Sequence, residues 1–302
     1  MLNDIRQGIT NSFSPNAADR LDSEGILSGF SGRKLITLLQ QMAALVDPHE
    51  TCYLEVGVFQ GLTLLSVASS RPELPCFGID NFAYFDPENK NRSIIRERQR
   101  RLGANNVHLI DEDYEDAFDH LNDHLQGRKI GVYFIDGPHD YRSQLMCLQL
   151  ALPFLADHAV IIVDDSNYEH VRMANRDFMR THPTFKLLFE SYTKAHPQNL
   201  RGPAHSAARA GWWNGVNLLV RDPDNRLSTH YPPTLRNRTL YENDSYVHSS
   251  RYAALLPEYL KVLRYVAPVW NALLGLKVPL PFRTRYKSLN TFSEDLPQEK
   301  LY

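Results

Sequence analysis

The chain has 302 residues, of which 43% are hydrophobic and 23% charged, and its formal net charge is −2 with a pI near 6.6. This composition is typical of a globular protein with room for one large domain and its appendages. The near-neutral charge argues against general nucleic-acid binding, which normally needs a basic face.

The N-terminal residues 1–26 are polar and lack periodicity, which predicts a loose or partner-dependent lead-in without a signal peptide. Residues 33–46 (RKLITLLQQMAALV) have apolar side chains at helical spacing and predict an amphipathic helix. The cysteines at 52, 76 and 147 lie in apolar stretches without metal-ligand spacing. We therefore expect reduced, buried thiols and a cytoplasmic location.

Strand and helix patterns alternate through the middle of the chain. Apolar runs predict strands at 52–58, 75–80, 106–110, 130–136 and 159–165. Helix-compatible segments lie between them at 61–70, 90–102, 114–126 and 141–155. Because the strands are apolar along their whole length, we expect a parallel sheet buried on both faces, and hence an α/β, Rossmann-like, doubly wound fold.

The end of this region differs from an ordinary dinucleotide-binding fold. A predicted helix at 168–181 is followed by two strands, 185–193 and 215–222, with a polar loop at 194–214 and no helix between them. Two strands joined in this way predict an antiparallel pair that closes the mostly parallel sheet, where an ordinary dinucleotide fold would continue with βα units.

The C-terminal part changes in composition. Residues 223–250 are rich in Pro, Asn, Ser, Thr and His and predict a linker, whereas 251–276 predict one or two helices interrupted near Pro257 and Pro268. We therefore divide the chain into an N-terminal lead-in and helix (1–50), a central domain (51–222), and a linker with a helical extension (223–302).

The helical extension is basic, since residues 251–287 contain seven Lys or Arg and one Glu. We favour a subunit contact in a homo-oligomer for this segment, with peripheral contact to an anionic membrane as the alternative. Its longest uncharged apolar run, 265–276, is too short to span a bilayer as a helix.

A glycine turn follows the first predicted strand. Glu55, Gly57 and Gly61 fall at a strand-to-helix junction, where glycine lets the backbone approach a ligand and the helix offers free N–H donors. Asp80 ends the second strand, where nucleotide-binding folds place an acid for ribose hydroxyls. The full GxGxxG pattern is missing, which disfavours a nicotinamide oxidoreductase and favours a nucleoside ligand without phosphates.

With these motifs, YLEVGVFQG and GIDNF, residues 50–222 resemble the class I S-adenosylmethionine-dependent methyltransferases. The resemblance implies that Gly57 and Gly61 form the turn beside the methionine part of the cofactor, that Glu55 supports this turn, and that Asp80 binds the ribose. It also implies that Asp113 and Tyr114, after the third strand, lie near the adenine. Alternatively, the acidic run 111–116 starts a helix at its positive end.

A second constellation lies at the ends of the fourth and fifth strands. Asp136, Asp164 and Asp165 should converge at the carboxyl edge of a parallel sheet, where their mutual repulsion needs a counter-charge. All-oxygen ligation suits Mg²⁺, with Mn²⁺ or Ca²⁺ as alternatives. His139 leaves the same strand as Asp136 and is a candidate general base.

This second pattern resembles the metal-dependent macrocin and mycinamicin sugar O-methyltransferases and the related cephalosporin-hydroxylase-like group. The resemblance implies that Asp136, Asp164 and Asp165 ligate Mg²⁺ and that His139 takes the proton. One departure is Asp164, because the first member of this acidic pair is often Glu in that group.

The predicted function is therefore S-adenosylmethionine- and Mg²⁺-dependent methylation of a hydroxyl on a small-molecule or glycan acceptor. A catechol-type O-methyltransferase and a non-catalytic, methyltransferase-like assembly module are the alternatives. Trp212 and Trp213 are candidates for stacking on a sugar, with packing of the loop against the sheet as an equally weighted reading.

Overall fold

The computed structural model describes residues 1–14, 25–193, 196–234, 256–275 and 296–302. Two compact units are present. One contains Met1–Pro233 together with the C-terminal strand, and the other is Thr234–Leu289, which is described chiefly at helix α12 (Leu256–Leu273).

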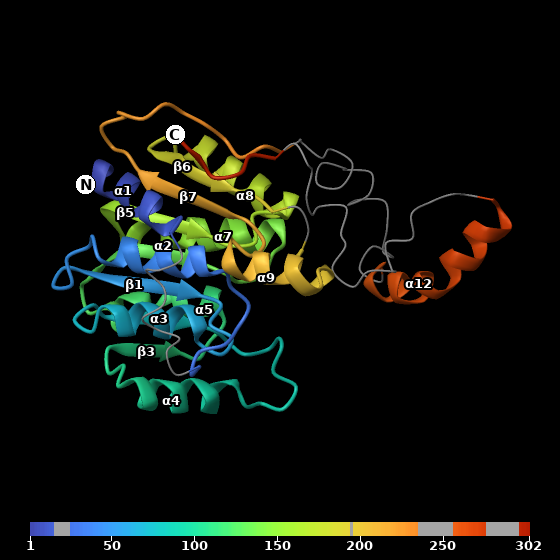
Figure 1. Ribbon diagram of the computed structural model, residues 1–302, viewed down its shortest axis with the longest axis horizontal. Helices are drawn as coiled ribbons and strands as arrows, with labels where there is room; N and C mark the ends of the chain where they lie inside the picture. Colours follow the sequence, from blue (N-terminus) through green and yellow to red (C-terminus); the bar gives the residue numbers. More distant parts are fainter. Residues whose placement is uncertain (15–24, 194–195, 235–255, 276–295) are drawn as a thin grey trace. The chain divides into compact units, whose positions relative to one another are not determined.

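A sheet forms the centre of the first unit (Figure 1). It has eight strands in the order β3-β2-β1-β4-β5-β7-β6-β8. The strands are β1 (Thr51–Val56), β2 (Cys76–Ile79), β3 (Val107–Ile110), β4 (Lys129–Ile135), β5 (Leu155–Val163), β6 (Phe185–Ser191), β7 (Val216–Arg221) and β8 (Lys300–Leu301). Strands β1 to β5 are parallel, whereas β7 runs antiparallel between β5 and β6. The predicted doubly wound fold and its closing antiparallel pair are confirmed.

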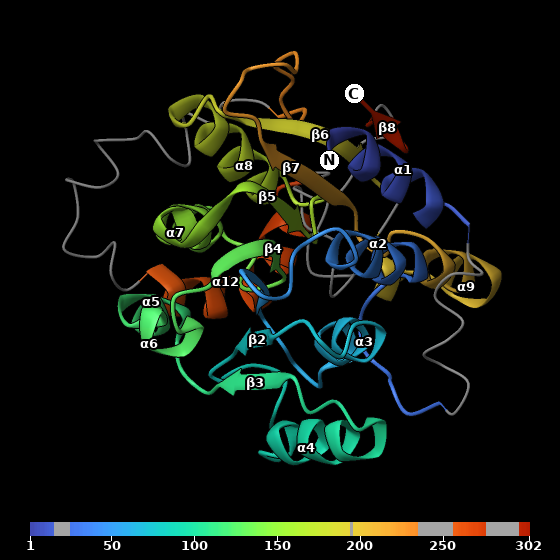
Figure 2. The ribbon, with the colours of Figure 1, turned by 90° about the vertical axis from the view of Figure 1, so that its left-hand side faces the viewer.

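Helices cover both faces of the sheet (Figure 2). On one face lie α1 (Leu2–Ser12), α2 (Arg33–Ala43), α3 (Leu62–Ser70) and α4 (Asn91–Leu102). On the other lie α5 (Tyr114–Asp119), α6 (Leu121–Leu125), α7 (Tyr141–Ala151) and α8 (Glu169–Thr181). Helix α9 (Gly202–Ala210) and the short 3-10 helices η2 (Leu152–Phe154) and η3 (Pro197–Asn199) occupy the connections.

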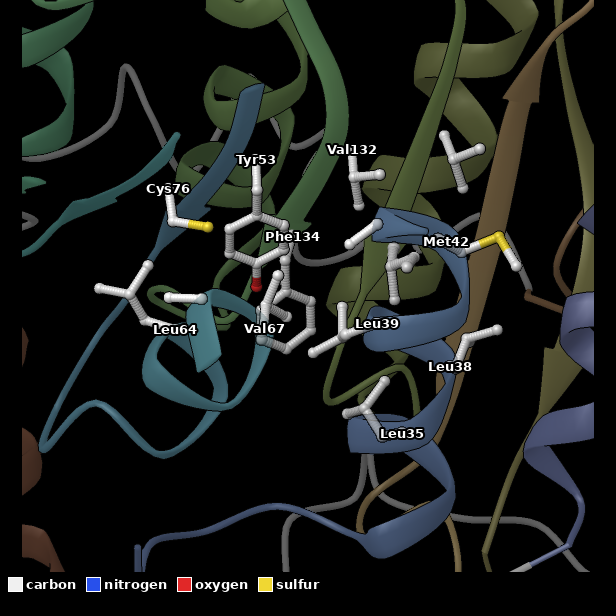
Figure 3. Close-up of a cluster of buried hydrophobic side chains, with 14 of the residues drawn as sticks. Leu35, Leu38, Leu39, Met42, Tyr53, Leu64, Val67, Cys76, Val132 and Phe134 are labelled. Atoms are coloured by element: carbon white, nitrogen blue, oxygen red, sulfur yellow. The ribbon is translucent and has the colours of Figure 1, made fainter. Parts of the chain in front are cut away.

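The core between the sheet and α2 follows from the apolar spacing of that helix. Leu35, Leu38, Leu39 and Met42 recur every three or four residues and are fully buried (Figure 3). They lie beside strand residues such as Phe134, also fully buried. This packing fixes β1 and β4 side by side and so sets the positions of the residues that follow each strand.

Three sequence predictions about local structure are wrong. Residues 2–12 of the predicted loose lead-in form α1, which buries Ile5 and Ile9 against the core. Residues 202–210 of the predicted polar loop form α9. The expected break at Pro268 is absent, since α12 continues through it; most of the predicted linker, residues 235–250, lies outside the described residues.

The three cysteines are buried and free, as expected, and burial raises the pKa of the Cys52 thiol to about 12. Within the described part of the chain, no helix combines the length and apolar character needed to cross a membrane.

Candidate active site

Most of the predicted site residues lie at or just after the carboxyl ends of β1 to β5, on both sides of the point where the strand order reverses. In open α/β sheets, ligands bind at this crevice because the two connections leave it in opposite directions.

Gly57 occupies a position that no other residue fits. Its φ is +91°, and a Cβ there would lie 2.1 Å from the carbonyl oxygen of Asp136. The turn after β1 therefore contacts the turn after β4 backbone to backbone. Gly61, with φ +77°, ends the same turn and precedes the first residue of α3.

Glu55 is fully buried beneath this turn. Its carboxyl group accepts hydrogen bonds from the Tyr53 hydroxyl at 2.6 Å and the Thr63 hydroxyl at 2.8 Å, which ties β1 to the start of α3. Burial raises the pKa of Glu55 to about 8, although both hydrogen bonds act in the opposite direction. The side chain therefore links β1 to the start of α3 beneath the turn.

Asp80 holds the glycine turn from the end of β2. Its Oδ2 accepts from the backbone N–H groups of Val58 and Phe59, both at 2.8 Å, and its Oδ1 accepts from that of Phe82 at 2.7 Å. A carboxylate has about four acceptor positions. These three contacts leave the Asp80 carboxylate an acceptor position for a further donor, such as a hydroxyl group. The Asp80 side chain is only half-buried, so a ligand can reach it.

Asp113 and Tyr114 lie after β3, next to the turn after β2. Asp113 caps α5 by accepting from the Glu115 N–H at 3.0 Å, and it also accepts from the Asn81 side chain at 3.2 Å. Tyr114 is buried, and burial raises the pKa of its hydroxyl to about 12. Asp113 therefore starts a helix, as the alternative interpretation of residues 111–116 expects. It also contacts Asn81, which directly follows Asp80.

The second constellation is compact. One potential ligand atom from each of Asp136, His139 and Asp165 lies within 4.8 Å of the other two. The closest contact joins His139 Nε2 to Asp165 Oδ2 at 2.6 Å. Asp164 lies next to this group and is buried: its Oδ1 accepts from the Asp165 N–H at 2.8 Å, whereas its Oδ2 is buried without a hydrogen-bond partner.

The titratable groups of this cluster have shifted pKa values. Burial, reinforced by the neighbouring carboxylates, raises the pKa of Asp136 and of Asp164 well above the ordinary value. Burial acts in the same direction on Asp165, but the charge and hydrogen bond of His139 outweigh it and lower the pKa of Asp165. Burial lowers the pKa of His139, and Asp165 more than offsets this, so that the pKa of His139 is raised.

Three further residues lie around His139 and Asp165, and the sequence analysis did not identify them. Asn214 donates to Asp165 Oδ1, the Tyr168 ring stacks on His139 with centroids 5.4 Å apart, and His196 lies behind Tyr168, with ring centroids 6.1 Å apart. Burial lowers the pKa of His196, although the charge of Asp165 opposes this. Tyr168 could have been found, because it lies three residues after Asp165 in the chain. Asn214 has no sequence signal, because only the pairing of β7 with β5 brings it next to Asp165.

The residues that follow His139 have structural partners. Asp140 caps α7 by accepting from the Ser143 N–H at 3.0 Å, and the Tyr141 hydroxyl donates to Asp177 at 2.8 Å. Both contacts anchor α7, which holds the turn bearing His139.

The two candidate stacking residues differ in position. Trp212 is in the core, where it contacts Phe13 and Phe189 and its indole N–H donates to Glu299 at 2.9 Å. Trp213, with φ +59°, belongs to a group of aromatic side chains beside the glycine turn. It contacts Phe30, which stacks on Phe59 in that turn. The group consists of Trp213, His205, Phe30, Phe59 and Phe85.

Residues 54–166 match the profile of a family described as "Methyltransferase domain". This segment contains the glycine turn and all three acids of the second constellation. No protein among the curated ones matches the chain.

Solved structures with a similar chain path include two O-methyltransferases. One, from Bacillus cereus in complex with SAH, is 16% identical over 71% of this chain and 90% of its own, with a TM-score of 0.43. The other, TomG from Streptomyces achromogenes, involved in tomaymycin synthesis and in complex with SAM, is 14% identical over 71% and 89%, with a TM-score of 0.46.

Proposed function

We propose that this chain, an S-adenosylmethionine-dependent methyltransferase by its domain and motifs, transfers the methyl group to a hydroxyl oxygen of a sugar or glycosylated acceptor with the help of Mg²⁺. The carrying observation is the contact between His139 and Asp165 beside two further acids, on the sheet edge that also bears the glycine turn.

The cofactor fits the first constellation. Gly57 and Gly61 would allow the methionine part to approach the backbone, and Asp80 has acceptor capacity for a ribose hydroxyl. Asp113 and Tyr114 would border the adenine, because Asp113 already contacts the turn that follows Asp80.

The second constellation fits a hard divalent cation. Asp164 Oδ2 is buried without a hydrogen-bond partner, and burial, reinforced by the neighbouring carboxylates, raises the pKa of Asp136 and of Asp164, a setting in which a bound cation would stabilise the ionised acids. Asp136, Asp164 and Asp165 would hold the ion, since each oxygen of Asp165 retains an acceptor position beside its contact to His139 or Asn214. A bound Mg²⁺ lowers the pKa of a hydroxyl that it coordinates.

His139 would accept the hydroxyl proton as the new C–O bond forms. With Nε2–H directed at Asp165, the lone pair of the neutral imidazole lies on Nδ1, a tautomer that we assign from this contact. Asp165 both orients the ring and stabilises the imidazolium after proton transfer, as the acid of a catalytic triad does. Stacking on Tyr168 restricts ring rotation further.

The test is a methyl-transfer assay with labelled cofactor on sugar, glycolipid and catechol acceptors, with Mg²⁺ and with EDTA. We expect Mg²⁺-dependent labelling of a sugar hydroxyl. Labelling of catechols alone would favour the catechol-type enzyme. Absence of S-adenosylmethionine binding and of Mg²⁺ binding in titration calorimetry would favour the non-catalytic module.

A further inference from the structure

Helix α12 exposes a continuous row of large apolar side chains. They are Tyr259, Val262, Leu263, Tyr265, Val266, Val269, Trp270 and Leu273, followed by Leu274 just beyond the helix, and each is between 48% and 75% exposed. The spacing of three and four residues places Tyr259, Val262, Val266, Val269 and Leu273 on one side of the helix. Such a face needs a partner, because water solvates it poorly.

This exposure sets α12 apart from the rest of the described chain. Elsewhere in the described chain, Met1, Tyr231 and Leu301 are exposed singly, whereas the exposed Phe30 and Phe85 belong to the aromatic group beside the glycine turn, with Tyr84 next to Phe85. Single exposed apolar residues are normal on a protein surface, whereas a contiguous stripe marks an interaction site.

The sequence around α12 also carries concentrated positive charge. Residues 251–287 contain seven Lys or Arg and one Glu, a net charge of +6, while the whole chain carries −2. The remaining residues therefore carry −8. An anionic surface would attract this segment and repel the remainder of the chain, which favours one orientation on that surface.

We propose that α12 binds the surface of an anionic lipid bilayer, with its apolar side inserted at the boundary between headgroups and acyl chains. Amphipathic helices with aromatic and apolar residues on one side and basic residues around them bind membranes in this way. Tyr259, Tyr265 and Trp270 supply the rings that prefer the interface. The helix lies on the bilayer and does not cross it.

Like-charge repulsion disfavours a second copy of the chain that pairs through α12. Two copies paired through α12 would bring two segments of net charge +6 together, and such like-charge contact opposes association. Anionic lipid headgroups instead neutralise the segment while the acyl region covers its apolar side.

Trp270 provides a direct probe of this contact. The chain has three tryptophans, of which Trp212 and Trp213 are buried and Trp270 is 60% exposed. We expect the fluorescence of the full-length protein to shift to the blue with phosphatidylglycerol–phosphatidylcholine vesicles and not with phosphatidylcholine vesicles. Trp270→Phe should lose the shift and still sediment with the anionic vesicles.

Variants locate the contact on α12. Val266→Glu with Leu273→Glu should weaken vesicle binding at least tenfold, since each places a carboxylate in the inserted side. Tyr259→Glu should weaken it measurably, whereas Tyr231→Glu, a matched exposed tyrosine outside α12, should leave it unchanged. Circular dichroism and S-adenosylmethionine titration confirm that each variant is folded.

Binding should fall as salt rises, because the basic segment is screened. Failure to sediment with anionic vesicles, or equal binding to neutral vesicles, would overturn the proposal. A Trp270 blue shift that grows with protein concentration in the absence of vesicles would assign the stripe to a second copy instead. None of these measurements requires turnover, so they stand apart from the test of methyl transfer.

Discussion

His139 Nε2 lies 2.6 Å from Asp165 Oδ2, and this contact joins the turn after β4 to the turn after β5 at the carboxyl edge of the sheet. Among the described residues, this contact joins the histidine of the second constellation to one of its acids. The proposed proton transfer depends on it.

Replacement of His139 by Ala should lower kcat by about 10²- to 10⁴-fold, the usual contribution of a general base. The affinity for S-adenosylmethionine should remain close to that of the native protein, because the glycine turn is untouched. Steady-state kinetics and calorimetry measure the two quantities, with the exposed His158 at the other end of the sheet replaced by Ala as the control. Lost cofactor affinity with retained turnover would rule out the base assignment.

The native enzyme should lose activity as the pH falls through the pKa of His139, because only the neutral imidazole accepts a proton. Asp165 raises this pKa above its ordinary value of 6.5, so the acidic limb of the kcat profile should lie above that pH. A profile without an acidic limb between pH 6 and 9 would contradict a histidine base.

Asp164→Asn should raise the thermal midpoint in EDTA, since it removes one of several repelling buried acids, and should abolish the stabilisation by Mg²⁺. Binding to the native state alone raises stability by about 2.7 kcal/mol at 100 times the Kd of the ion. Differential scanning fluorimetry with and without Mg²⁺ checks both effects. Equal Mg²⁺ stabilisation of the native protein and the variant would exclude Asp164 as a ligand.

Gly57→Ala should destabilise the fold by more than ~3 kcal/mol, because its Cβ would meet the Asp136 carbonyl at 2.1 Å in addition to the strain of a positive φ. Gly103→Ala is the matched control: its φ is +64° and its Cβ meets nothing within 4 Å. It should cost only about 1 kcal/mol from strain. Urea unfolding of both variants tests the difference, and equal destabilisation would show that the backbone contact is unimportant.

The pKa of Glu55 predicts the pH dependence of stability. This pKa is about 8 in the folded protein, against an ordinary value of 4.5. The folded state therefore holds the proton more tightly, so Glu55 favours folding fully below pH 4.5 and loses this contribution as the pH rises toward 8. Glu55→Gln should flatten the stability profile in this window by up to roughly 5 kcal/mol. Parallel profiles for the variant and the native protein would contradict a proton on Glu55.

Much of the fold follows from local sequence patterns. Fully apolar runs predicted the parallel strands, and two late strands without an intervening helix predicted the antiparallel pair. Strand β8 is different, because two residues carry no periodicity and its place depends on pairing of Leu301 with Phe189. Helix α1 was missed because only three of its residues, Leu2, Ile5 and Ile9, are large and apolar, while Gly8 and Ser12 share its buried side.

The site was predictable where residues directly follow strands. Sheet topology brings together the residues at the carboxyl ends of β1, β2, β4 and β5. The positions of Glu55, Asp80, Asp136 and Asp165 at the ends of predicted strands are therefore sufficient to predict that they share one edge of the sheet. Asn214 was not predictable, because it reaches Asp165 only through the antiparallel register that pairs Val163 with Asn217. The roles of Trp212 and Trp213 likewise depended on packing, which places one in the core and the other in the aromatic group.

The most direct test of the central claim is single-turnover methyl transfer from labelled S-adenosylmethionine to a sugar acceptor, compared between the native protein and His139→Ala with saturating Mg²⁺ or EDTA. We predict labelled O-methyl product only for the native protein with Mg²⁺. Full transfer in EDTA, or by His139→Ala, would contradict it.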